Sequence, residues 1–131
     1  MAESPSGQVL RSIALFPLNV VLFPGMRLPL HIFEERYRLM IRRCLDEGLE
    51  FGVCLIQAGP EVGGPATPYQ VGTLTHLRDV ARLPDGRFNL LTEGTSRFRL
   101  LELTAEEPYL QAIVELLPEV SPASENLAPV V

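Results

Sequence analysis

Residues 15–37 read LFPLNVVLFPGMRLPLHIFEERY, and two changes of secondary structure inside this stretch guide the interpretation of the whole chain. Its first part continues an apolar, β-rich run that begins at Val9. Pro17 within that run indicates an edge strand or a break, because proline cannot donate to a sheet ladder. The Pro-Gly pair at 24–25 is a turn signal. Residues 27–32 then alternate apolar and other side chains, which predicts a half-buried strand.

A helix is predicted over residues 34–47. Apolar residues recur there at helical spacing and form a single stripe, which a helix can bury against a core. Gly48 follows directly and suits the left-handed residue that ends many helices. The stripe consists of Tyr37, Met40, Ile41, Cys44 and Leu45.

The rest of the chain is typical of an antiparallel meander. The apolar run at 51–56 predicts a central strand, and the three Gly and three Pro within 58–68 predict a surface loop. Further strands are expected at 69–83, 88–92, 96–103 and 109–117, turns at 84–87, 93–95 and 106–108, and a bulge at Leu100-Leu101.

One helix and six or seven strands predict an α+β fold that is mostly β. A small, partly closed barrel with one packed helix fits this pattern, because it leaves few strand edges exposed. The folded domain is expected to span residues 9–118. Residues 1–8 are expected to be a disordered leader, and the proline-containing residues 119–131 a tail or linker.

The composition excludes several classes of function. The chain has 131 residues, which is the size of one domain, and its 11 basic and 16 acidic residues give a net charge of −5. All the basic residues are Arg. Without Lys, the chain cannot contain a Walker-type phosphate loop, a Ser–Lys dyad or a Schiff-base lysine.

The sequence also predicts a cytoplasmic protein that does not enter membranes. The apolar stretch at 13–33 contains three prolines and Arg27, which a membrane span would not tolerate. Residues 1–7 carry Glu3 and no basic residue, so they do not resemble a signal peptide.

No pattern of metal binding or catalysis stands out. His31, His76, Cys44 and Cys54 have neither CxxC nor HxxxH spacing, and both cysteines occupy apolar positions typical of a core. The sequence has no nucleophile-elbow motif. We therefore expect no metal, no cofactor, no catalytic residues and no enzymatic activity.

Several blocks of sequence resemble a known family in order along residues 9–118. The first blocks are LFPL, VLFPG, LPLHIFE and RY at 15–18, 21–25, 28–34 and 36–37; the later ones are FGV, VGT, LPDGR, GTSRF and PYL at 51–53, 71–73, 83–87, 94–98 and 108–110. They resemble the N-terminal, substrate-binding domain of Lon proteases. Stand-alone bacterial proteins built from that domain are the closer match.

The resemblance implies a PUA-like pseudo-barrel with one packed helix. It also implies non-catalytic recognition of unfolded or extended polypeptides, as an adaptor or a stand-alone relative. The ATPase and Ser–Lys protease modules of Lon do not fit so short a chain without Lys. Family members usually continue with a helical bundle, so residues 119–131 would be a tail or a linker to an absent helical segment.

Recognition of polypeptide needs an exposed apolar patch or a free sheet edge, and the first turn offers the best candidate. The seven residues at 20–26 surround a Pro-Gly turn and cannot all point inward. We expect Leu22, Phe23 and Met26 to be partly exposed, and the loop at 58–68 to border the site. The predicted peptide-binding residues are Val21, Leu22, Phe23, Pro24 and Met26.

Two alternatives use other features of the chain. PUA-like barrels elsewhere bind RNA, and Arg side chains on neighbouring strands would form a basic face at Arg78, Arg82, Arg87, Arg97 and Arg99. The net charge of −5 makes nucleic acid the less favoured partner. The other alternative is self-association, in which the apolar patch forms a homo-oligomer.

Overall fold

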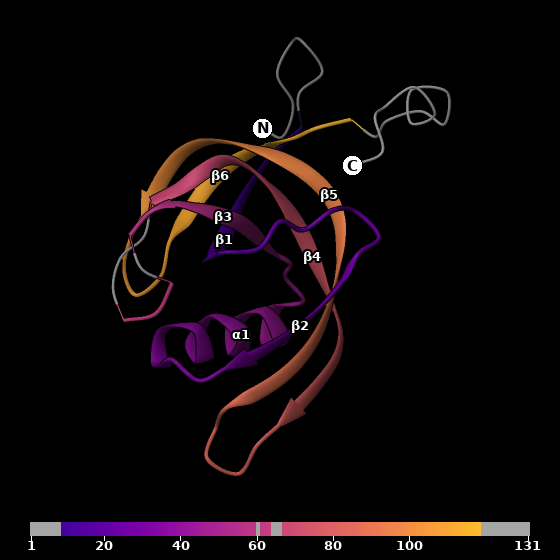
Figure 1. Ribbon diagram of the computed structural model, residues 1–131, viewed down its shortest axis with the longest axis vertical. Helices are drawn as coiled ribbons and strands as arrows, with labels where there is room; N and C mark the ends of the chain where they lie inside the picture. Colours follow the sequence, from indigo (N-terminus) through magenta and orange to yellow (C-terminus); the bar gives the residue numbers. More distant parts are fainter. Residues whose placement is uncertain (1–8, 60, 64–66, 119–131) are drawn as a thin grey trace.

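The computed structural model describes residues 9–59, 61–63 and 67–118, and within them a mostly β fold with one helix (Figure 1). The expected leader at 1–8 and tail at 119–131 lie outside the described residues. The elements are β1 (Val9–Leu18), β2 (Arg27–Ile32), α1 (Glu35–Glu47), β3 (Phe51–Ala58), β4 (Thr67–Arg82), β5 (Phe88–Ala105) and β6 (Gln111–Leu116). The predicted fold class is confirmed.

The strand pairings form a closed ring. β3 lies between β1, its parallel neighbour, and β4, its antiparallel neighbour. β4 pairs with β5, and β6 pairs with both β5 and β1, so that the last strand joins the first. Among the described strands, β2 pairs with β5 alone, and α1 lies beside β2 at one end of the ring (Figure 1).

Pro17 occupies a local edge, as its residue type predicts. β1 pairs with β6 only over residues 9–14, and from Ala14 onward it pairs with β3. The amide of Leu15 donates to the carbonyl of Leu110 at 2.9 Å, so odd-numbered residues of β1 direct their backbone groups away from β3. Pro17 therefore removes a donor on the side where β1 has no neighbouring strand within the described ranges.

The turn predicted at 93–95 is wrong, because β5 continues without interruption from Phe88 to Ala105. The first half of β5 pairs with β2 and the second half with β6. Gly94 lies where the partner changes, under the backbone of Phe23. A glycine is needed there for close approach, not for a turn. The bulge predicted at Leu100-Leu101 is confirmed by a register shift between Leu100 and Glu102.

The helix joins the main hydrophobic core through the predicted stripe. Tyr37, Met40, Ile41 and Cys44 are buried, and Leu45 is half-buried against the same core. Gly48 ends the helix in the left-handed region with φ 66°, and its N–H donates to the carbonyl of Cys44. A second core cluster, centred on Phe98, involves side chains of β1, β3, β4, β5 and β6.

Replacing Gly94 with Ala should destabilise the fold by about 2 kcal/mol, because the new methyl group would collide with the Phe23 carbonyl oxygen. Urea unfolding would measure this loss. Glu102→Ala, at an exposed position of the same strand, serves as the control and should change stability by less than about 0.5 kcal/mol. Equal unfolding midpoints for the two variants would show that the close approach at Gly94 is unimportant.

Candidate functional site

The predicted first turn is present and is closed by its own backbone. The amide of Met26 donates to the carbonyl of Phe23 at 3.0 Å. Pro24 and Gly25 are the two central residues, and Gly25 has φ 84°. A type II turn requires a positive φ at that position, and proline favours the position before it. The sequence Phe-Pro-Gly-Met thus folds locally as its residue types dictate.

The turn is also fastened to the sheet on both sides. Gly25 donates its N–H to the carbonyl of Gly94 at 2.8 Å, and Gly94 donates to the carbonyl of Met26 at 2.9 Å. The buried hydroxyl of Thr73 on β4 donates to the carbonyl of Leu22 at 2.7 Å. Because the backbone of the turn is held this way, the directions of its side chains are set in advance of any binding.

The side chains of the turn divide between core and solvent. Leu22 is only 5% exposed, so the expectation that it is partly exposed is wrong: its side chain packs into the main core. Phe23 is 56% exposed and Val21 48%, while Met26 is 36% exposed. The prediction of exposure is therefore confirmed for Phe23 and Met26, and Pro24 is exposed as well.

Two residues of β4 extend this apolar surface. Tyr69 and Val71 are 45% and 40% exposed, and they line a groove of about 240 Å³ together with Val21 and Phe23. We call these four residues the first-turn patch. Sequence analysis missed the two β4 residues, although their spacing of two within a strand was a signal that they share a face.

Not every predicted neighbour reaches the patch. Neither Pro24 nor Met26 lines the groove. The loop at 58–68 was expected to border the site, but within its described part Glu61 and Val62 line a different groove, beside β2 and the start of α1. The first-turn patch thus includes fewer residues of the turn than predicted, and it extends onto β4.

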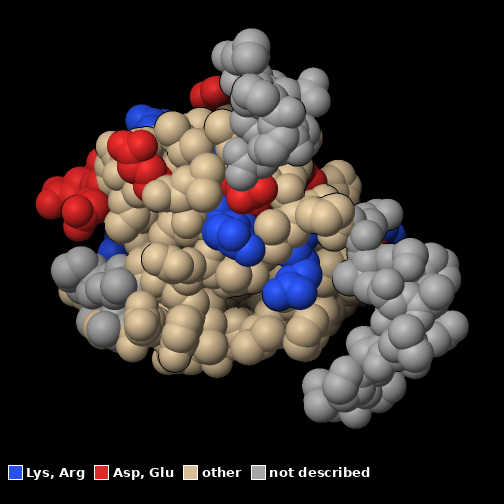
Figure 2. All heavy atoms as spheres, turned by 90° about the horizontal axis from the view of Figure 1, so that it is seen from above, with Lys and Arg blue, Asp and Glu red and all other residues tan. Residues whose placement is uncertain are grey.

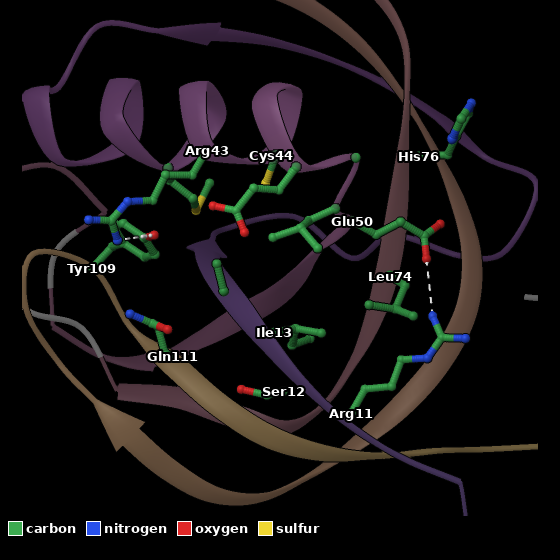
Figure 3. Close-up of a pocket in the computed structure, with 15 residues that line it drawn as sticks. Arg11, Ser12, Ile13, Arg43, Cys44, Glu50, Leu74, His76, Tyr109 and Gln111 are labelled. Atoms are coloured by element: carbon green, nitrogen blue, oxygen red, sulfur yellow. Dashed lines mark hydrogen bonds and ion pairs between the residues drawn. The ribbon is translucent and has the colours of Figure 1, made fainter. Parts of the chain in front are cut away.

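A larger cleft of about 660 Å³ lies between α1 and the ring, at its β1 side (Figure 3). The helix contributes residues from its last two turns, and β1 contributes residues 11–14. Arg43 donates to the hydroxyl of Tyr109 at 3.0 Å, and Arg11 forms an ion pair with Glu50 at 3.6 Å. Sequence analysis did not anticipate this cleft, because it depends on which strands are neighbours.

The five Arg side chains considered for RNA do not all remain available. Arg78 pairs with Glu93 at 3.0 Å and Arg87 with Asp85 at 2.6 Å, while Arg82 lies over the ring of Phe88. Figure 2 shows small, separate basic groups near acidic ones on a mainly uncharged face. On the face that Figure 2 shows, the basic groups do not form the continuous surface that phosphate binding favours.

The two cysteines are buried and have no sign of activation. Burial raises the pKa of Cys44 to about 11, with a contribution from Glu47, and burial raises the pKa of Cys54 to about 12. A nucleophilic or metal-binding thiol needs the opposite shift. Across the described ranges, no group of three or more His, Cys, Asp or Glu lies together as a metal site would require.

The helix of the described residues is too short to cross a bilayer. α1 contains 13 residues, and no helix in that part of the chain has the length and apolar character of a membrane span.

Sequence comparisons with known proteins all find similarity to Lon proteases. A family model described as the ATP-dependent protease La (LON) substrate-binding domain matches residues 12–131. The chain is 34% identical over 130 residues to a Lon protease of Desulfovibrio desulfuricans, and 35% identical over 110 residues to one of Porphyromonas gingivalis. These matches cover 93% and 82% of this chain, but the chain spans only 15% and 13% of the two proteases.

Solved structures agree with the sequence comparison. A crystal structure of a Lon N-terminal domain protein from Xanthomonas campestris is 33% identical, with a TM-score of 0.71; the match covers 89% of this chain and 69% of that one. The N-terminal domain of a Mycobacterium avium complex Lon protease is 19% identical, with a TM-score of 0.58 over 88% of this chain and 59% of that one. The second structure shows a likeness of fold alone.

Both thiols should be unreactive in the folded protein at about pH 8, since neither ionises there, and both should react with a thiol reagent after unfolding in urea. As the pH rises above 9.0, the ordinary thiol pKa, the unfolded chain loses thiol protons that the folded chain keeps. The free energy of unfolding should therefore fall from about pH 9 upward. Fast modification of the native protein would contradict this prediction.

Proposed function

Because this chain belongs to the ATP-dependent protease La (LON) substrate-binding domain family, we propose that it recognises unfolded or extended segments of polypeptide without catalysing a reaction on them. It acts in the cytoplasm as an adaptor or as a stand-alone relative of the Lon domain. The observation that carries the proposal is the first-turn patch, in which the half-exposed side chains of Val21 and Phe23, at a turn whose backbone is held by the sheet, line one groove with those of Tyr69 and Val71 on β4.

The chemistry of the patch suits a partner that exposes apolar side chains. Unfolded chains do so, and burying apolar surface contributes about 25 cal/mol for each Å² removed from water. Phe23 and Tyr69 offer large rings for this contact, and Val21 and Val71 line the same groove. Since the turn is already ordered, binding loses little conformational entropy on the protein side.

The five residues predicted from the sequence have different parts in this proposal. Val21 and Phe23 would contact the polypeptide directly, while buried Leu22 anchors the turn from below. Pro24 shapes the turn, and Met26, which is 36% exposed outside the groove, would contact only a longer segment.

The variant carrying Val21→Ser and Phe23→Ser should bind a permanently unfolded polypeptide at least about tenfold more weakly than the native protein, because the partner loses its apolar contacts. Fluorescence titration with a labelled unfolded polypeptide would measure the change. Both positions are exposed, so the midpoint of urea unfolding should change little. Phe33→Ser is the matched control, since Phe33 is 46% exposed but does not line the groove.

The same titration at low and high salt separates the alternatives. Apolar recognition should weaken little with salt. For RNA binding through Arg side chains, the logarithm of the affinity would fall against the logarithm of the salt concentration with a slope of about one per phosphate contact. RNA binding alone would reject the proposal. Sedimentation over a range of concentrations tests the homo-oligomer: a dimer dissociated by Phe23→Ser would assign the patch to self-association.

A further inference from the structure

The large cleft runs along the edge of a strand. Four consecutive residues of β1, numbers 11–14, line it. Successive side chains of a strand point to opposite faces, so a cavity that meets four in a row must follow the strand's edge instead of one face. Figure 3 shows the labelled members of this run, Arg11, Ser12 and Ile13, on one side of the cleft and α1 on another.

That edge is unpaired in the described part of the chain. β6 pairs with β1 over residues 9–14, and β3 pairs with the opposite edge only from Ala14 onward. The bond from the Leu15 amide to the Leu110 carbonyl sets the alternation, so residues with odd numbers face β6 and Ser12 faces the other way. The backbone N–H and C=O of Ser12 therefore point to the open edge.

The space beside this open edge is where β3 would lie if that strand began earlier in the sequence. β3 starts at Phe51, which pairs with Ala14 of β1 and Thr75 of β4. The chain before it, from Gly48 to Glu50, instead forms the connection from α1. All three of these connecting residues line the cleft. The cleft thus lies in line with β3, beside a strand edge that has no partner among the residues that the structure describes.

The walls of the cleft suit a polypeptide better than a polyanion. Ile13, Leu74 and Met40 provide apolar surface, and the rim carries two Arg and two Glu side chains, Arg11, Arg43, Glu47 and Glu50. Equal numbers of cations and carboxylates leave no net attraction for phosphate but match the uncharged amides of a main chain. The Arg11–Glu50 pair is 52% and 31% exposed, so a ligand displaces it at little cost.

We propose that this cleft binds an extended polypeptide segment as an added strand along β1. The segment forms backbone hydrogen bonds with Ser12 and places alternate side chains on the apolar walls between α1 and the ring. The inference rests on the proposed function, because it takes extended polypeptide as the ligand. It assigns that ligand a second site, on the other side of β1 from β6 and lined by none of the first-turn patch residues.

Amide hydrogen exchange tests the added strand residue by residue. In the free protein, the amides of Arg11 and Ile13 should exchange slowly because they face β6, whereas that of Ser12 should exchange quickly. A short peptide that alternates Val and Thr should slow exchange at Ser12 and leave its neighbours unchanged. The same peptide with alternate amides N-methylated is the matched control and should have no effect.

Ser12→Pro provides the complementary variant, since it removes the N–H of the open edge and no hydrogen bond to β6. The affinity for the peptide should fall by about tenfold, because the variant loses one backbone hydrogen bond and the close approach of the two backbones. If this variant fails to fold, the N-methylated peptide still decides the question. The variant with Val21→Ser and Phe23→Ser should retain the protection at Ser12.

The outcomes separate this inference from the proposed function. Binding of the peptide or of an unfolded polypeptide without protection of Ser12 overturns the added strand and leaves the proposed function intact. Absence of binding by both ligands overturns the two together. Protection of Ser12 by single-stranded RNA and not by peptide also overturns the added strand.

Discussion

The contact between the first turn and Gly94 is the constraint on which the rest of the structure depends. Both backbone groups of Gly94 bond to the turn, one to Gly25 and one to Met26. A side chain at this position would occupy the space of the Phe23 carbonyl. Because the turn is held here, β2 starts in register with β5, and the chain then reaches the beginning of α1 with its apolar stripe facing the core.

The same contact explains how one long strand serves two hydrophobic cores. Before Gly94, β5 contributes Phe88 and Leu90 to the core shared with α1; after it, Phe98 enters the core inside the ring. The strand exchanges β2 for β6 as its neighbour between these points. The first turn therefore contacts β5 at the point where this strand passes from one core to the other.

Local sequence patterns predicted the elements in which buried residues recur at one regular spacing along the chain. The helical stripe ending at Gly48, the alternation of β2 and the bulge at Leu100 are all visible in the sequence. The turn expected at 93–95 failed because glycine next to polar residues has the same local appearance whether the chain reverses or another backbone passes close by. Only the distant Phe23 distinguishes these cases.

The candidate site was predictable only in part, for a related reason. The apolar run at the first turn was evident, but the turn geometry decides that Leu22 faces inward while Phe23 faces solvent. Tyr69 and Val71 join the patch through strand pairing across the sheet, and the open edge at Ser12 exists because β3 begins late.

Closure of the ring by β6 also has a consequence for biosynthesis. Among the described strands, β1 can pair with β3 as soon as both have left the ribosome, whereas its pairing with β6 must wait for the last of them, so completion of the ring is a late event in folding.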